Sequence, residues 1–119
     1  MRAVDFEALK QAIQRQHTLL TRHAQNELIA DLLEEESVWL SILAPGARII
    51  EEYPDDPRGP SCLILSFVQQ QPVHTVVAYP ARRAAAAQQH IAVAVMITAY
   101  RPDKRPHEWD ADYQTRLSS

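Results

Sequence analysis

The first third of the chain carries apolar residues at helical spacing and predicts three helices. They are expected to begin at Asp5, at Thr21 and at Glu34. Aspartate and threonine are residue types that cap helix N-termini, and the acids of residues 34–36 suit the positive end of a helix. Residues 17–20 fit either a strand or a connector. The boundary between the second and third helices stays open.

Beyond Pro45 and Gly46 the apolar period changes from helical to two, which is the period of a β-strand. Four strands are expected, over residues 48–53, 61–68, 73–79 and 91–100. The last of these runs, IAVAVMITAY, is apolar at odd and even positions alike. We expect it in the middle of the sheet, with odd and even residues on opposite faces. Residues 80–90 are interpreted as a surface insertion.

Helices followed by strands with short links predict an α+β fold. We expect two to three N-terminal helices packed on a four-stranded antiparallel sheet. A length of 119 residues fits a single domain over residues 1–119. Within it, residues 1–17 are expected to form an N-terminal helical extension and residues 18–119 the core.

Composition narrows the class of protein. No apolar run approaches the roughly 20 residues of a membrane span, so no membrane partner is expected. Cys62 is the only cysteine and no signal-peptide pattern is present, which indicates the cytoplasm. A net charge of −3 argues against a strong nonspecific nucleic-acid binder. Three bases among residues 101–105 still allow a local basic site.

Two histidines are candidates for acid–base chemistry. His23 precedes Glu27 by four residues, which on a helix places an imidazole beside a carboxylate that can orient it. The alternative is an ordinary surface pair. His74 lies inside an apolar strand, where it is either a packed core residue or the polar end of a cleft.

The polar end of the last predicted strand is a further candidate site. Thr98, Tyr100 and Arg101 offer two hydroxyls and a guanidinium, a set that can hold a phosphate. The alternative is the ordinary polar rim of a strand. No cluster of histidine, cysteine and carboxylate residues has the spacing of metal ligands, so neither a metal nor a cofactor is expected.

Four stretches of the chain, taken in order, resemble one known family. They are TRHA at 21–24, IIEEYPDD at 49–56, PVHTVVA at 72–78 and ITAYRPD at 97–103, with Glu108 and Trp109 following. Together they resemble the domain of unknown function 4258, a small bacterial family related to the RelE-like toxin nucleases. The resemblance spans roughly residues 19–117 and is specific for the family rather than for an activity.

The RelE-like relationship implies a RelE-like or barnase-like layout and a metal-independent endoribonuclease of the toxin–antitoxin type. Such enzymes use the 2′-hydroxyl of RNA as the nucleophile. The matching catalytic candidates are His23, His74 and Tyr100, and the matching substrate-binding candidates are Arg22, Thr98 and Arg101. RNA and an antitoxin-like protein are the implied partners, and a homodimer stays open.

The chain departs from the family pattern at Glu27, where an arginine is usual. An acid beside the candidate site favours a second hypothesis, a noncatalytic protein- or ligand-binding domain of the same fold. A third is a structural subunit whose histidines belong to the core.

Overall fold

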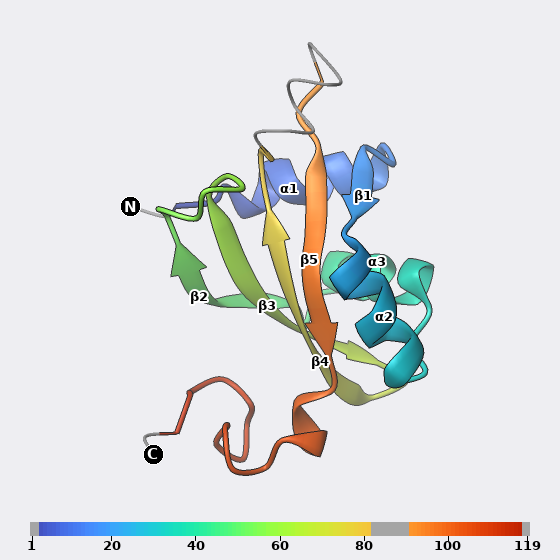
Figure 1. Cartoon of the computed structure of the whole chain (residues 1–119), viewed down its shortest axis with the longest axis vertical. Helices are drawn as coiled ribbons and strands as arrows, with labels where there is room; N and C mark the ends of the chain where they lie inside the picture. The colour runs from blue at the N-terminus through green and yellow to red at the C-terminus, as the bar shows by residue number, and fades with distance from the viewer. Residues whose placement is uncertain (1–2, 82–90, 118–119) are drawn as a thin grey trace.

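The computed structural model describes residues 3–81 and 91–117. Most of the insertion expected at residues 80–90 therefore lies outside the described residues. The helices and strands are α1 (Phe6–Gln14), β1 (Thr18–Leu20), α2 (Arg22–Ala30), α3 (Glu35–Leu43), β2 (Arg48–Tyr53), β3 (Ser61–Val68), β4 (Gln71–Ala78), β5 (Ala94–Tyr100) and the 3-10 turn η1 (Pro102–Lys104). Helices α1 and α3 lie behind the sheet and α2 lies beside β5 (Figure 1).

The sheet has five strands in the order β1-β5-β4-β3-β2. Strand β1 pairs with β5 in parallel, and the other neighbours are antiparallel. The α+β class is confirmed, but the expected four-stranded antiparallel sheet is wrong. Residues 18–20 are too few to show a strand period, and they become a strand only because β5 offers them a partner. The last strand lies inside the sheet, between β1 and β4, although the middle strand of the five is β4 rather than β5.

Both predicted helix caps are confirmed, at Asp5 and at Thr21. The Thr21 hydroxyl accepts a hydrogen bond from the Ala24 amide at 3.0 Å and donates one to the Ile97 carbonyl at 3.1 Å. The second bond ties the start of α2 to β5. Leu32 separates α2 from α3, because its φ of 55° is left-handed and cannot continue a right-handed helix.

The main core lies between the helices and the sheet. Its fully buried members include Leu9, Val38, Ile42, Ile64, Val73, Val77 and Met96. One buried polar contact crosses it, a 2.7 Å hydrogen bond between the hydroxyls of Ser41 on α3 and Ser66 on β3. None of the helices in the described ranges is long and apolar enough to cross a membrane.

A register shift between β4 and β5 decides which side chains face away from the helices. Ala99 packs in the helix-side core with Met96, although its odd number placed it with Ile97. The expected strict alternation along the last strand is therefore wrong beyond Ile97, because a bulge inserts one residue. As a result Tyr100 lies opposite His74 on the sheet face that α1 and α3 leave uncovered, called here the open face.

Candidate functional site

Residues 101–117, called here the C-terminal strap, leave the end of β5 and run below the sheet towards the side of β2 (Figure 1). His74 lies against this strap. The imidazole is fully buried. Its Nε2 lies 2.7 Å from the Tyr113 carbonyl oxygen and its Nδ1 lies 3.0 Å from the Tyr100 hydroxyl. A carbonyl only accepts, so Nε2 carries the proton and Nδ1 accepts from Tyr100. Trp109 packs edge-on, with ring centroids 4.2 Å apart.

The environment of this cluster keeps both rings neutral near pH 7. Burial lowers the pKa of His74 to about 4, against weaker opposing effects of the Tyr113 carbonyl and of Glu51. The guanidinium groups of Arg116 and Arg105 lower it further. Burial also raises the pKa of Tyr100. The pair is thus a neutral hydrogen-bonded unit that anchors the strap.

Acidification is expected to destabilise the protein through His74. The unfolded side chain has a pKa near 6.5 and the folded one about 4, so the unfolded state binds more protons between these values. The free energy of unfolding then falls as pH drops from 6.5 towards 4, by up to about 3 kcal/mol. Urea unfolding of the wild type and of His74→Gln at pH 7 and pH 4.5 measures this change in the free energy of unfolding. The variant lacks the imidazole, so its free energy of unfolding is expected to fall less between the two pH values. Equal pH dependence in both proteins would contradict it.

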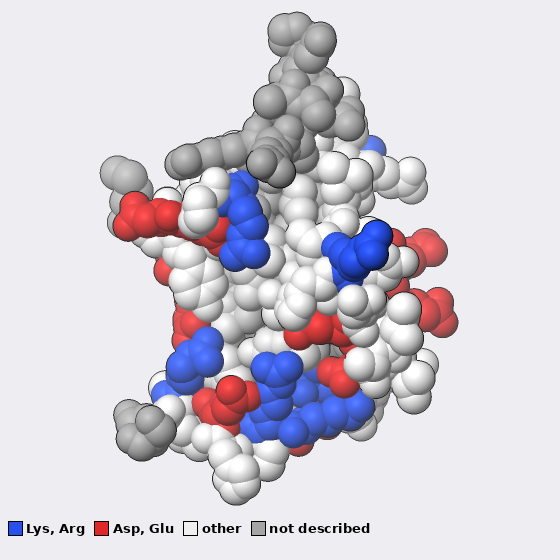
Figure 2. Space-filling model, viewed as in Figure 1, with Lys and Arg blue, Asp and Glu red and all other residues white. Residues whose placement is uncertain are grey.

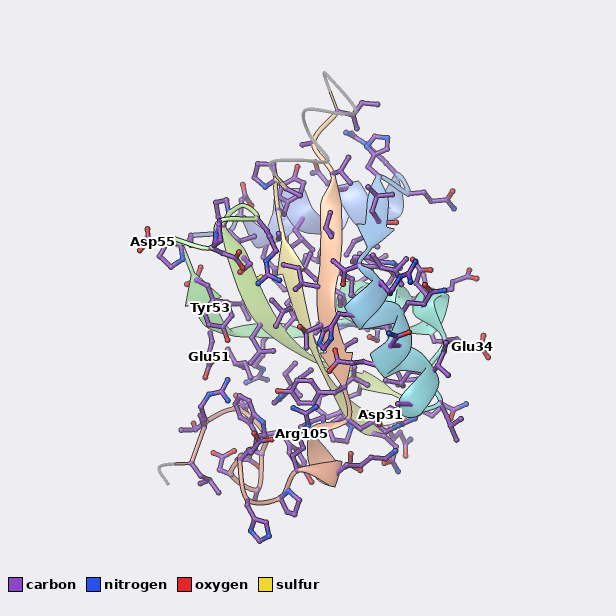
Figure 3. The ribbon with its side chains drawn as sticks, viewed as in Figure 1. Asp31, Glu34, Glu51, Tyr53, Asp55 and Arg105 are labelled. Atoms are coloured by element: carbon purple, nitrogen blue, oxygen red, sulfur yellow. The ribbon has the colours of Figure 1, made fainter. Side chains whose placement is uncertain are left out.

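A carboxylate on edge strand β2 holds the far end of the strap. Arg116 donates hydrogen bonds to Glu51 at 3.1 and 3.3 Å, and the Tyr53 hydroxyl donates another. Although burial acts in the opposite direction, the bonds from Arg116 and Tyr53 lower the pKa of Glu51. The Arg116 guanidinium also lies 4.5 Å from the centroid of the Trp109 ring. Figure 3 shows Glu51 and Tyr53 together on β2.

The rest of the acidic stretch after Glu51 has a structural role. Glu52 accepts a hydrogen bond from the Ala3 amide at 2.8 Å and so ties the N-terminal segment to β2. Asp56 accepts hydrogen bonds from Arg58 and from the Ser61 hydroxyl, and against the effect of burial they lower its pKa to about 2. Asp56 therefore organises the β2–β3 turn, whereas Glu52 anchors the N-terminal segment.

A second cluster is built on Glu27 of α2. Its Oε1 accepts a 2.9 Å hydrogen bond from the Ala99 amide and lies 3.3 Å from Nε2 of His23. Its Oε2 lies 3.7 Å from the guanidinium of Arg105 on the strap. The Glu27 side chain is 17% exposed, whereas that of His23 is 67% exposed. A mostly buried carboxylate thus holds an accessible imidazole and a guanidinium at the rim of the open face.

Arg105 connects the two clusters. Its guanidinium carbon lies 3.9 Å from the centroid of the Tyr100 ring, within the range of a cation–π contact. Tyr100 in turn donates to His74. A continuous set of contacts therefore runs from the exposed imidazole of His23 through Glu27, Arg105 and Tyr100 to the buried imidazole of His74.

The open face is hollow and mostly uncharged at its centre, with basic side chains gathered along its lower border (Figure 2). Three bases of the strap, Lys104, Arg105 and Arg116, are paired with acids. Arg105 lies near Glu27 and Glu108, Lys104 lies 3.2 Å from Asp31, and Arg116 binds Glu51. Figure 3 shows Asp31 and Arg105 along this border. Charge is balanced there rather than strongly basic.

The substrate-binding candidates occupy three different settings. Arg22 is exposed on the first turn of α2, and Thr98 is half-buried opposite Val76 on β4. Arg101 turns towards the end of α2, where its amide donates to the Asp31 carboxylate at 2.8 Å and its Nε to the Asp31 carbonyl at 3.2 Å. Arg101 thus fastens the start of the strap to α2.

The clusters combine residues that the sequence predicted with others that it did not. The structure brings Tyr100 beside His74 and connects both to His23 through other side chains. The residues not predicted include Glu51, Arg105 and Trp109. Two of them lie in or beside the quoted family stretches, and Arg105 lies in the basic run. Among the described residues no group of three or more histidine, cysteine and carboxylate side chains could hold a metal ion.

Comparison with known proteins gives one match. A family model described as Domain of unknown function (DUF4258) matches residues 20–101, more than half of the chain. The match runs from the end of β1 to the first residue of the strap. No curated protein and no solved structure matches the chain.

Proposed function

The chain belongs to the family of the domain of unknown function 4258, and from this premise we propose that it is a RelE-like, metal-independent endoribonuclease that binds RNA on its open face. One observation carries the proposal. The Glu27 carboxylate holds an accessible imidazole, His23, and a guanidinium, Arg105, beside the same hollow surface. An acid–base group next to a fixed positive charge is what cleavage at a phosphate requires.

In the proposed reaction His23 acts first as the base and then as the acid, and the nucleophile is the 2′-hydroxyl of the RNA itself. The Glu27 carboxylate lies 3.3 Å from Nε2 of His23 and orients the ring, and in this proposal Nδ1 takes the proton of the RNA 2′-hydroxyl. The 2′-oxygen then bonds to the adjacent phosphorus and the bond from phosphorus to the 5′-oxygen breaks. The leaving oxygen takes a proton from the imidazolium, which restores His23. Arg105 stabilises the added negative charge on the phosphate.

The other candidates have supporting roles in this proposal. Tyr100 and His74 are positioning residues, because the Tyr100 ring supports Arg105 and His74 accepts from the Tyr100 hydroxyl. The proposal assigns contacts with the RNA backbone to Arg22, exposed on the first turn of α2, and to Thr98, on β5 opposite Val76. Arg101 orients the strap rather than the substrate.

Cleavage of a single-stranded RNA oligonucleotide by the full chain tests the proposal. Cleavage is expected to persist in excess chelator and to leave a 2′,3′-cyclic phosphate, because the 2′-oxygen is the nucleophile. A DNA oligonucleotide of the same sequence is expected to stay intact, since it lacks that hydroxyl. Absence of RNA cleavage, a requirement for divalent cation, or equal cleavage of DNA would each contradict the proposal.

A noncatalytic binding domain is the second candidate, and the balanced charge along the lower border of the open face favours it. Each of Lys104, Arg105 and Arg116 already pairs with an acid, which weakens attraction for a polyanion. RNA binding measured at low and at moderate salt separates the candidates. A nuclease binds at low salt and releases as salt rises, whereas a domain that recognises a protein, an antitoxin-like protein included, does not bind RNA at low salt.

A further inference from the structure

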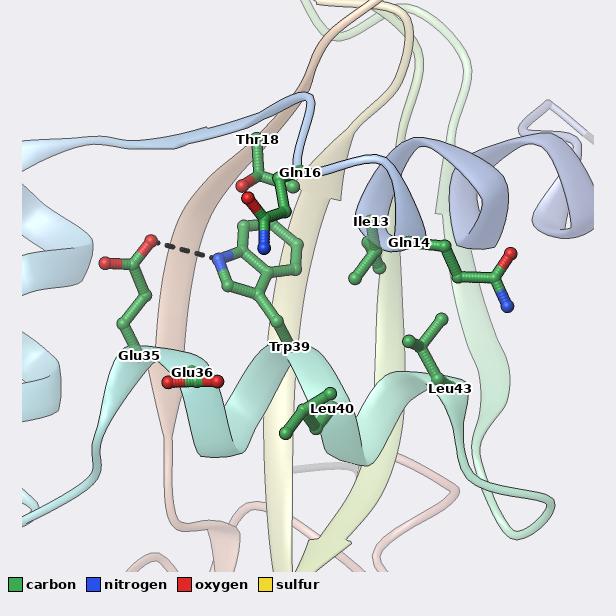
Figure 4. A pocket seen from close by; sticks show the side chains of 9 residues that line it. All are labelled: Ile13, Gln14, Gln16, Thr18, Glu35, Glu36, Trp39, Leu40 and Leu43. Carbon is green, nitrogen blue, oxygen red and sulfur yellow. Dashed lines mark hydrogen bonds between the residues drawn. The ribbon is translucent and has the colours of Figure 1, made fainter.

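A groove lies on the helical layer, behind the sheet and away from the open face. It runs between the end of α1, the start of β1 and the outer side of α3, and has a volume of about 460 Å³ (Figure 4). Its lining residues are Ile13, Gln14, Gln16, Thr18, Glu35, Glu36, Trp39, Leu40 and Leu43. Nothing in the proposed nuclease chemistry uses this surface.

The floor of the groove is apolar and partly uncovered. Leu40 is 57% exposed, although it is a large aliphatic side chain in the middle of a helix. Trp39 beside it is buried, and its Nε1 donates a 3.0 Å hydrogen bond to Glu35, so the indole ring is fixed in place (Figure 4). A rigid aromatic group beside an exposed leucine in a hollow is typical of surfaces that receive an apolar anchor.

The charge of the groove is entirely negative. Its lining holds two carboxylates, Glu35 and Glu36, and no lysine, arginine or histidine. Glu36 forms no ion pair with any residue in the described part of the chain. The preceding Glu34 is also exposed. A ligand that covers the apolar floor thus meets, at one end, two carboxylates of the first turn of α3 with no cationic side chain in the lining.

From this combination we propose that the groove binds a basic amphipathic helix of a partner protein. Helix α3 lines the groove from Glu35 to Leu43, nine residues, which corresponds to about 13 Å and to two or three turns of a docked helix. Apolar residues three and four positions apart cover Leu40 and Leu43, and lysine or arginine at one end meets Glu35 and Glu36.

The same charges argue against two other occupants. RNA is repelled, because its phosphates would face two carboxylates. A second copy of this chain docked through the same groove brings no basic side chain to Glu35 and Glu36, because a two-fold contact is self-complementary and the lining holds no lysine, arginine or histidine. The basic helix remains as the occupant with complementary charge. This proposal does not depend on the proposed nuclease activity, because the groove lies on the opposite side of the sheet.

A pair of designed peptides tests the proposal against the full chain. The first is a fluorescein-labelled helix of about 14 residues with leucines along one face and lysines on the flanks. The second has glutamate in place of every lysine. Fluorescence anisotropy is expected to show binding of the lysine peptide, weakened by salt, and no binding of the glutamate peptide. Absence of binding by the lysine peptide, or equal binding of both, would overturn the proposal.

Variants then place the binding in the groove. Leu40→Ser is expected to lower the affinity for the lysine peptide roughly tenfold, and Glu36→Lys roughly fivefold. Both residues are exposed, so neither change is expected to unfold the protein. The matched controls are Leu32→Ser, an exposed leucine outside the groove, and Asp55→Lys, an exposed acid on the β2–β3 turn. Affinity is expected to stay within about twofold in both controls. Equal losses in groove and control variants would show nonspecific attraction and reject the site.

Discussion

Replacement of His74 by alanine is expected to lower the free energy of unfolding by about 3–4 kcal/mol at pH 7. The change leaves the Tyr113 carbonyl and the Tyr100 hydroxyl without their partner, at about 1–3 kcal/mol for each buried group that stays unsatisfied. It also opens a cavity beside Trp109, which packs against the ring. The strap is expected to relax into part of the cavity, so the total loss of free energy stays below the sum of these separate effects. Urea unfolding followed by circular dichroism measures the effect.

Two further variants separate the causes. His74→Phe keeps an aromatic ring but removes both hydrogen bonds. It is therefore expected to lower the free energy of unfolding, but by less than His74→Ala does. His107→Ala is the control, because His107 is an exposed histidine on the same strap and is expected to change stability by less than about 0.5 kcal/mol. A loss in His74→Ala no larger than that in His107→Ala would show that the buried imidazole does not hold the strap.

The second large effect is expected on catalysis. His23→Ala is expected to lower the rate of RNA cleavage by about 10²- to 10⁴-fold, the usual contribution of a general acid–base group. The free energy of unfolding is expected to change little, because the His23 side chain is 67% exposed. Single-turnover cleavage of the RNA oligonucleotide, with urea unfolding of the same samples, measures both quantities.

Companion variants make the assignment of His23 specific. Glu27→Gln keeps the shape of the side chain but weakens its hold on the imidazole, so a smaller loss of rate is expected than for His23→Ala. His107→Ala again serves as the control and is expected to cleave at the wild-type rate. Unchanged cleavage by His23→Ala would remove this residue from the proposed chemistry even if the protein remained a ribonuclease.

The local parts of the fold were predictable and the long-range parts were not. The helix caps at Asp5 and Thr21 follow from side-chain hydrogen bonds within three residues, which a sequence pattern records. Strand β1 and the bulge between β4 and β5 depend on how distant strands meet. Three residues carry too little periodicity to reveal a strand. The bulge changes which face the side chains beyond Ile97 lie on, but the apolar pattern of the strand's own sequence carries no sign of it.

The candidate site divides in the same way. The contact between His23 and Glu27 is a helical pair four residues apart, so it could be expected from spacing. Whether His74 is buried or accessible depends on the return of the strap, and nothing in its own strand decides that. The anchoring of Arg101 to Asp31 and the stacking of Arg105 on Tyr100 likewise require the folded chain.

The position of β1 at the sheet edge has a consequence for chain entropy. The Gln69–Gln70 turn closes the β3–β4 hairpin within a few residues, whereas the bond that ties Thr21 to Ile97 spans 76 positions. The entropic cost of closing a loop grows with its length, and only three residue pairs between β1 and β5 offset that cost. The pairing of β1 therefore depends on the Thr21 hydrogen bond and on the packing of α2 against β5, and we expect β1 to separate from β5 before the longer strand pairs open.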